Sequence, residues 1–138
     1  MKAPTYKQVT YRKSTYHLPA KALGGTRQAP MLKPADELLL NWAYDTANAD
    51  ELPYVALYHD RMGVLCTCVS AQKKRFISND VRHHQRLVAA YERNNLGAVP
   101  DNLNLLELPT TGAPINLLQI PKSLDMFELY LHHVAATS

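Results

Sequence analysis

The chain has 138 residues, of which 46% are hydrophobic and 20% charged, and its net charge is +3. This length suits one domain or one domain with a tail, and the composition excludes a chain that is disordered throughout. No apolar run approaches the roughly 20 residues of a membrane span. The polar, tyrosine-rich start also lacks the apolar core of a signal peptide, so we expect no membrane partner and a cytoplasmic location.

Charge is distributed in blocks along the chain. Residues 1–35 carry seven cations and no acid, and residues 36–60 carry six acids and no cation. Residues 61–93 carry seven cations and two acids, and residues 94–138 one cation and four acids. Such blocks indicate surfaces organised to meet a partner. The alternative is that neighbouring blocks pair with each other inside the molecule.

Residues 1–34 are predicted to form an extended basic arm, because their prolines and a Gly-Gly pair disfavour a long helix. A Thr-Tyr pair recurs every five residues, with cations between the pairs. Aromatic rings interleaved with cations suit base stacking and phosphate contacts, and the alternative is that the tyrosines pack on their own domain or a second subunit. The candidate nucleic-acid-binding residues of the arm are Tyr6, Tyr11, Tyr16, Lys7, Arg12 and Lys13.

Residues 34–49 are predicted to form the first helix. Pro34 suits an early helical position, and two acids follow it near the positive end of the helix dipole. Leu38, Leu39, Trp42, Ala43 and Thr46 fall on one side at 100° per residue, and Leu40 and Tyr44 form a second apolar strip. We therefore expect a helix buried on two sides and interpret Trp42 as a core anchor.

Residues 54–69 are predicted to form a β-hairpin whose connection is residues 59–63. Cys66 and Cys68 lie on its return strand and are too close in sequence to form a disulfide, so we expect reduced thiols. A metal site completed by His59 and a later histidine is the alternative. Cys-x-Cys fits no standard zinc spacing, so we expect no metal and no cofactor.

A helix over residues 80–95 gives the clearest periodic signal. Arg82, Arg86 and Arg93 form one stripe opposite an apolar face. A stripe of arginines suits phosphate or carboxylate contacts, and a solvated helix face is the alternative. The candidate nucleic-acid-binding residues here are Arg82, Arg86 and Arg93, together with the preceding Lys73, Lys74 and Arg75.

Two similar leucine-rich segments, residues 103–109 and 115–121, each end on a proline. We expect two short extended segments that pack side by side. A short helix from Ser123 to about Val134 is expected to dock on the body or on a second copy, so a homo-oligomer stays among the expected partners.

Together these elements predict an α+β fold. It is a small single domain with a helix–β-hairpin–helix centre, an extended basic N-terminal arm (1–34) and a short C-terminal helix, the compact part being residues 35–138.

The predicted function is a small nucleic-acid-binding regulatory or accessory protein, with DNA or RNA as partner. The alternative is a protein-binding modulator of the kind that viruses and other mobile elements encode, which binds an acidic surface of a larger complex. We expect no catalysis, because no cofactor loop or oxyanion hole accompanies the cysteines.

Overall fold

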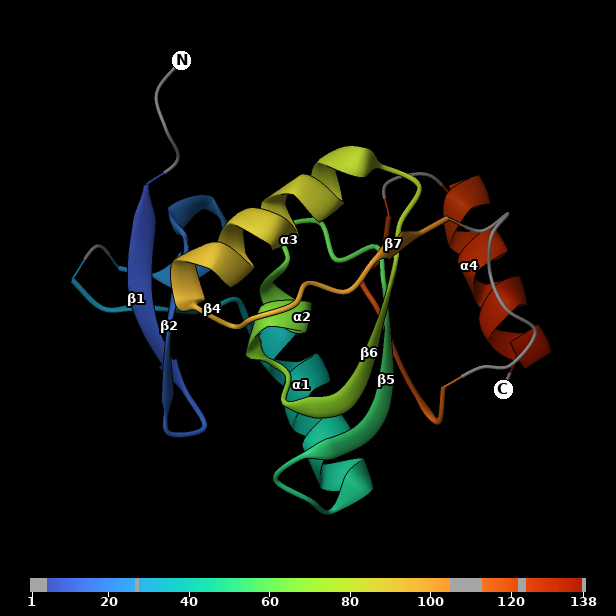
Figure 1. Cartoon of the computed structure of the whole chain (residues 1–138), viewed down its shortest axis with the longest axis horizontal. Coiled ribbons are helices and arrows are strands. Elements are labelled where there is room, and N and C mark those ends of the chain that lie inside the picture. The colour runs from blue at the N-terminus through green and yellow to red at the C-terminus, as the bar shows by residue number, and fades with distance from the viewer. Residues whose placement is uncertain (1–4, 27, 105–112, 122–123, 138) are drawn as a thin grey trace.

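Short strand pairs come first in the chain, and strands that alternate with helices follow them (Figure 1). The computed structural model describes residues 5–26, 28–104, 113–121 and 124–137. The strands are β1 (Tyr6–Tyr11), β2 (Ser14–Pro19), β3 (Leu23–Gly25), β4 (Pro30–Leu32), β5 (Leu52–Tyr58), β6 (Ala71–Ile77), β7 (Asn102–Leu103) and β8 (Ile115–Leu118). The helices are α1 (Pro34–Ala47), α2 (Val64–Cys68), α3 (Val81–Asn94) and α4 (Leu124–Thr137), and a 3-10 turn spans Ala20–Ala22.

The central feature is a parallel sheet of four strands in the order β7-β6-β5-β8. The chain passes from β5 to β6 through α2 and from β6 to β7 through α3. A small mixed α and β domain is therefore confirmed, but the predicted hairpin at 54–69 is wrong. Its expected return strand, which carries both cysteines, is helix α2, and β5 pairs with β6 in parallel.

The side chain of Asp60 explains why this apolar segment becomes a helix. Its carboxylate accepts hydrogen bonds from the backbone N–H groups of Leu65 (3.3 Å) and Cys66 (2.8 Å). These N–H groups lie in the first turn of α2, where the helix itself offers no acceptor. Asp60, which lies outside the five-residue helix α2, thus supplies hydrogen-bond acceptors for N–H groups of its first turn.

Helices cover the sheet on both faces (Figure 1). Val55 and Leu57 of β5 lie in the larger core with buried residues of α1, α2 and α3, whereas Ala56 and Tyr58 pack with Tyr130 of α4. Coverage on both faces is typical of parallel sheets and accounts for the apolar run in β5.

The N-terminal segment folds onto this body. β1 pairs antiparallel with β2, and β3 with β4. Val9, Tyr11 and Leu18 belong to the same core cluster as Leu40 of α1. The expectation of an extended arm is therefore corrected, because these side chains bury apolar surface. The division of the chain at residue 34 stays a prediction.

Helix α1 matches its predicted position, and the expected second strip of Leu40 and Tyr44 is buried, but Leu38 and Trp42 of the first side are not. Leu40, Ala43 and Tyr44 are buried, whereas Trp42 is 50% exposed and Leu38 is 70% exposed. The buried residues repeat at helical spacing, and Trp42 lies beside this strip. The expectation that Trp42 anchors the core is wrong.

Of the first leucine-rich segment the structure describes Leu103 and Asn104, and Leu103 pairs with Ile77 of β6 rather than with the second segment. β7 and β8 form the opposite edges of the sheet, separated by β6 and β5. Residues 105–109 of the first segment lie outside the described residues, as does Ser123, the expected cap of the last helix. Within the described ranges, no helix is long and apolar enough to cross a membrane.

Candidate functional site

The three arginines predicted as an outward stripe on α3 each contact another part of the protein. Arg82 binds the carboxylate of Asp80, with its Nη2 2.7 Å from Oδ2. Arg86 donates from Nη1 to the backbone oxygen of Arg61 (2.9 Å). The guanidinium of Arg93 lies 4.2 Å from the ring centre of Tyr6. The stripe exists, but its members are held in separate local contacts.

The Lys73–Arg75 cluster is divided between the two faces of β6, because neighbouring strand residues point in opposite directions. Lys74 points inward and donates to the backbone oxygen of Cys66 (2.8 Å) and to the hydroxyl of Tyr91 (3.0 Å). Burial lowers the pKa of Lys74. Lys73 and Arg75 lie over the ring of Tyr54 on the other face, and Arg75 is buried.

The candidate tyrosines contact their own domain, as in the alternative interpretation. Tyr11 is buried and donates to Asn41 (2.8 Å), and burial raises its pKa to about 12. The hydroxyl of Tyr16 donates to the backbone oxygen of Cys68 (3.4 Å). Tyr6 lies under Arg93, as described above.

The cations of the first strand pair differ in their surroundings. Arg12 stacks on Tyr44 and pairs with Asp50 (3.0 Å). Lys7 on β1 is half-buried, and Lys13 in the β1–β2 turn is exposed. The twelve predicted residues therefore do not form one continuous surface.

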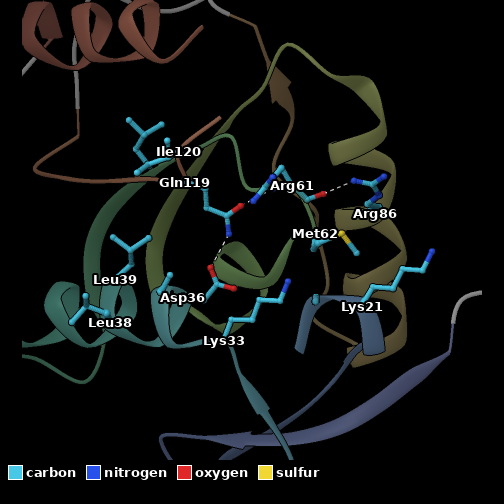
Figure 2. A pocket seen from close by; sticks show the side chains of 13 residues that line it. Lys21, Lys33, Asp36, Leu38, Leu39, Arg61, Met62, Arg86, Gln119 and Ile120 are labelled. Atoms are coloured by element: carbon cyan, nitrogen blue, oxygen red, sulfur yellow. Dashed lines mark hydrogen bonds between the residues drawn. The ribbon is translucent and has the colours of Figure 1, made fainter. Parts of the chain in front are cut away.

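A cavity at the carboxyl end of the parallel strands gathers a different set of cations. It has a volume of about 590 Å³ and lies among the start of α1, the loop after β5, the end of β8 and one side of α3. Four positive side chains line it: Lys21, Lys33, Arg61 and Arg86. We call this the cationic pocket (Figure 2).

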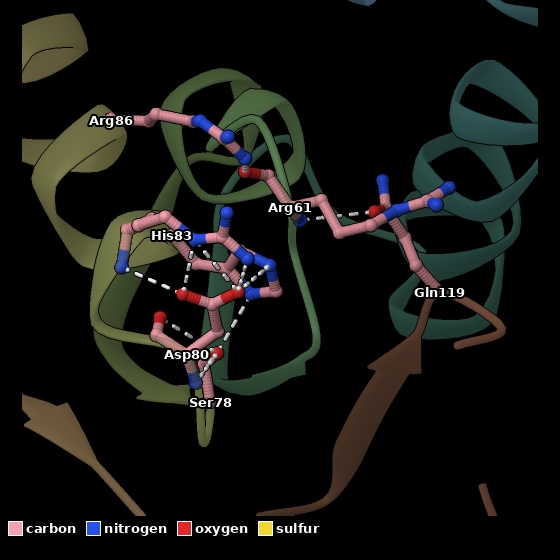
Figure 3. A network of polar contacts seen from close by, with 7 residues as sticks. Arg61, Ser78, Asp80, His83, Arg86 and Gln119 are labelled. Carbon is pink, nitrogen blue, oxygen red and sulfur yellow. Dashed lines mark hydrogen bonds and ion pairs between the residues drawn. The ribbon is translucent and has the colours of Figure 1, made fainter. Parts of the chain in front are cut away.

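A chain of hydrogen bonds holds the walls of the cationic pocket in place. Gln119, just after β8, donates from Nε2 to Oδ1 of Asp36 (2.8 Å) and accepts from the backbone N–H of Arg61 (3.1 Å). The Arg61 backbone oxygen in turn accepts from Arg86 (2.9 Å). Four separate segments are thereby linked around one opening (Figures 2 and 3).

The pocket carries an excess of positive charge. Asp36 is the single carboxylate among its lining residues, against four cations. Burial raises the pKa of Asp36, although Gln119, Lys33 and Arg61 favour its ionised form. None of the four cations forms an ion pair with a carboxylate in the described part of the chain. These charges are therefore available to an anionic ligand.

The location agrees with a general rule for parallel sheets. The connections from β5 run towards β6 and β7, whereas β8 pairs on the opposite side of β5. Ligands of α/β proteins bind outside the carboxyl ends of the strands, where the strand order reverses. Arg61 follows β5 and Gln119 follows β8, so both residues lie at this reversal.

A second polar network stabilises the start of α3 beside the pocket (Figure 3). Oγ of Ser78 lies 2.7 Å from Nδ1 of His83, and Nε2 of His83 lies 3.7 Å from Asp80. Burial, with His59 nearby, lowers the pKa of His83 to about 4. Ser78 is fully buried and also bonds the backbone of Asp80. The hydrogen bonds to the backbone of Asp80 fit a role in stabilising the start of α3. Because Ser78 is buried, a substrate cannot reach it, and the network is not a catalytic site.

Both cysteines are free and buried within α2. Burial raises the pKa of Cys66 to about 12 and raises that of Cys68 as well. Neither thiol is therefore poised as a thiolate nucleophile. Among the residues that the structure describes, no three metal-ligating side chains come together.

Sequence reasoning missed Lys21, Lys33 and Arg61 as site residues. Lys21 and Lys33 belong to the basic block, and Arg61 directly follows an apolar strand, but they lie in three different connections. Only the parallel order of the sheet and the folding back of the N-terminal segment bring them to Arg86.

The family model for the RLMG N-terminal domain matches residues 12–138. The comparisons with curated proteins and with solved structures gave no match.

Proposed function

The chain belongs to the family of RLMG N-terminal domains, and from that premise we propose that it is an accessory domain that binds nucleic acid at the cationic pocket. In this proposal the domain binds its ligand and catalyses no reaction. The finer part of the sequence-based hypothesis, a basic arm and an arginine stripe, is replaced by one enclosed set of cations.

The single observation that carries the proposal is the convergence of four cations around one cavity. Lys21, Lys33 and Arg61 are exposed, and no carboxylate in the described residues pairs with them. Phosphate groups supply the complementary charge, and arginine binds them with two parallel hydrogen bonds. The family name, which refers to an rRNA methyltransferase-related N-terminal domain, favours RNA as the nucleic acid to test first.

A protein partner is the second candidate, and one observation favours it. Leu124, Leu129 and Leu131 of α4 are large apolar side chains that are exposed. Exposed apolar patches mark interaction surfaces. In this alternative, an acidic protein surface takes the place of RNA at the cations.

The test compares two variants that remove the same amount of charge. The pocket variant changes Lys21, Lys33 and Arg61 together to Gln, and the control variant changes Lys13, Lys73 and Arg93 together to Gln. All six side chains are exposed. The free energy of unfolding of each variant should therefore differ from that of the wild type by no more than about 0.5 kcal/mol per substitution. Binding of a labelled single-stranded RNA is measured by fluorescence anisotropy over a range of salt concentrations.

We expect the pocket variant to lose most of its RNA affinity. The slope of log K against log salt should flatten by about 2, since each lost phosphate contact to a single strand removes about 0.7. The control variant should bind RNA nearly as the wild type does. Equal losses of RNA affinity in both variants would contradict a localised site. If the wild type binds no RNA at low salt, the protein partner becomes the favoured proposal.

A further inference from the structure

We propose that the cationic pocket accepts one unstacked nucleotide, with its base against an apolar wall and its phosphate against the cations. This inference rests on the proposed function and adds the form of the ligand. It follows from the way the two kinds of side chain are divided within the cavity.

The lining residues are unevenly distributed around the pocket, with Lys33 and Arg61 in the middle of the view (Figure 2). Leu38, Leu39 and Ile120 lie together on one side, and Lys21 and Arg86 lie on the other. A ligand that fits both sides has an apolar, flat part and an anionic part at its other end. A nucleotide has this composition.

The apolar side is unusually open to solvent for its residue types. Leu38 is 70% exposed and Ile120 is 69% exposed, although both border a cavity. A base that has left the stack is held between aromatic or apolar side chains in enzymes that flip bases, and Leu38 and Ile120 offer an apolar surface of this kind. The cavity volume of about 590 Å³ lies within the roughly 300–1,000 Å³ typical of small-ligand sites.

Polar groups between the two sides can read the edge of a base. Gln119 uses one N–H of its amide for Asp36, and an amide carries two. Asp36 accepts that bond on Oδ1 and carries a second carboxyl oxygen. Both groups are held by the framework of hydrogen bonds, so they offer fixed donors and acceptors rather than mobile ones.

The cavity selects against a base that stays in a duplex. A paired base presents only its edge in a groove, and a base must leave the stack before its flat face can pack against Leu38 and Ile120. The ligand is therefore a nucleotide in a single strand, a bulge or a loop, or a free nucleotide with the same chemistry.

The first measurement titrates the wild-type protein with AMP, GMP, CMP and UMP, the matching nucleosides and inorganic phosphate, followed by NMR or calorimetry. We expect at least one monophosphate to bind at least about ten-fold more tightly than its nucleoside, because the phosphate adds charged hydrogen bonds, and than inorganic phosphate, because the base adds apolar contact. Inorganic phosphate that binds as tightly as every nucleotide would overturn the proposal, as would the absence of monophosphate binding at millimolar concentration.

Matched variants separate the two sides of the pocket. Leu38→Gln and Ile120→Gln should each weaken monophosphate binding by about three- to ten-fold and leave phosphate binding unchanged. Leu129→Gln makes the same leucine change on exposed α4 and should alter neither. Lys21→Gln should weaken both ligands. Unchanged monophosphate binding in Leu38→Gln and Ile120→Gln would show that no base lies on the apolar wall.

The source of the nucleotide is tested with a single-stranded oligonucleotide and a fully paired duplex of the same sequence. We expect pocket-dependent binding of the single strand and weak, Leu38-independent binding of the duplex. If RNA binding depends on the pocket cations but no monophosphate binds, the nucleotide inference fails and the proposed function stands. If monophosphates bind and RNA does not, the proposed function fails and the pocket is a site for free nucleotides.

Discussion

Asp60 is a fully buried carboxyl group in the loop that carries Arg61. Burial raises its pKa to about 7, against two backbone hydrogen bonds and Lys74, which favour the ionised form. The neighbouring Asp36 raises it further. The residue that caps α2 and shapes the pocket loop therefore changes its charge near neutral pH.

This pKa makes the contribution of Asp60 to stability fall as pH rises, whereas the lowered pKa of His83 adds a contribution that rises between about pH 4 and pH 6.5. Between about pH 4 and pH 7, the unfolded Asp60 carboxyl loses its proton while the folded one retains it, so its contribution to the free energy of unfolding decreases. The difference between the two pKa values corresponds to at most about 4 kcal/mol. Above pH 7 both states are ionised and the decrease ends. Urea unfolding at a series of pH values measures this dependence.

Asp60→Asn removes the ionisable group and keeps the shape of the side chain, but its amide nitrogen cannot accept, so one of the two backbone N–H groups of α2 loses its acceptor. We expect the variant to be less stable than the wild type near pH 4, because a buried N–H is left without its acceptor, and we expect this difference to shrink by pH 7, where the wild-type carboxyl has ionised. The pH dependence that remains in the variant combines the decrease from Asp36, whose pKa is raised, with the increase from His83, whose pKa is lowered. An unchanged pH dependence in Asp60→Asn would show that Asp60 ionises normally.

At the scale of elements, α2 and α3 approach each other closely at Gly63. This residue has φ 73°, and a Cβ there would lie 3.1 Å from the Cα of Leu87. Gly97 after α3 has a similar φ of 84° but has no atom within 4 Å of such a Cβ. The two glycines share a backbone conformation and differ in their surroundings.

Gly63→Ala should therefore destabilise the protein more than Gly97→Ala. Both substitutions incur the cost of the left-handed conformation, about 1–2 kcal/mol. Gly63→Ala must also displace α3, which we expect to add about 1–3 kcal/mol. Urea denaturation of both variants gives the difference, and equal losses would contradict the close approach of α2 to α3.

The elements also show what the sequence can and cannot predict. α1 and α3 were predictable because Pro34 and Asp80 mark their starts and helical periodicity runs over 14 residues in each. α2 was not, because five apolar residues are too short for periodicity to separate helix from strand. The hydrogen bonds from the first turn of α2 to the carboxylate of Asp60 favour the helix, and helical periodicity does not reveal such bonds.

The first strand pair was missed for a related reason. Its two-residue turn consists of Arg12 and Lys13, at φ 47° and 69°. Such turns usually contain Asn or Gly, which adopt positive φ readily. Without that signal, the sequence predicts an extended arm and leaves open whether its tyrosines bind nucleic acid or pack on the domain.

At the scale of the whole molecule, the site depends on topology. The cationic pocket draws Lys21 and Lys33 from the N-terminal segment, Arg61 from the loop after β5 and Arg86 from α3. The charge blocks of the sequence indicated an anionic partner, and Arg86 was among the candidates. The grouping of these cations was not predictable, since it requires the parallel strand order and the packing of the first 34 residues.

The most direct test of the account is the protection of individual lysines from acylation by bound RNA, measured by mass spectrometry. Lys21, Lys33, Lys13 and Lys73 are all exposed, so each should react in the free protein. When single-stranded RNA is bound, we predict that Lys21 and Lys33 lose reactivity while Lys13 and Lys73 retain it. Protection of Lys13 and Lys73 with continued reactivity of Lys21 and Lys33 would contradict the cationic pocket as the nucleic-acid site.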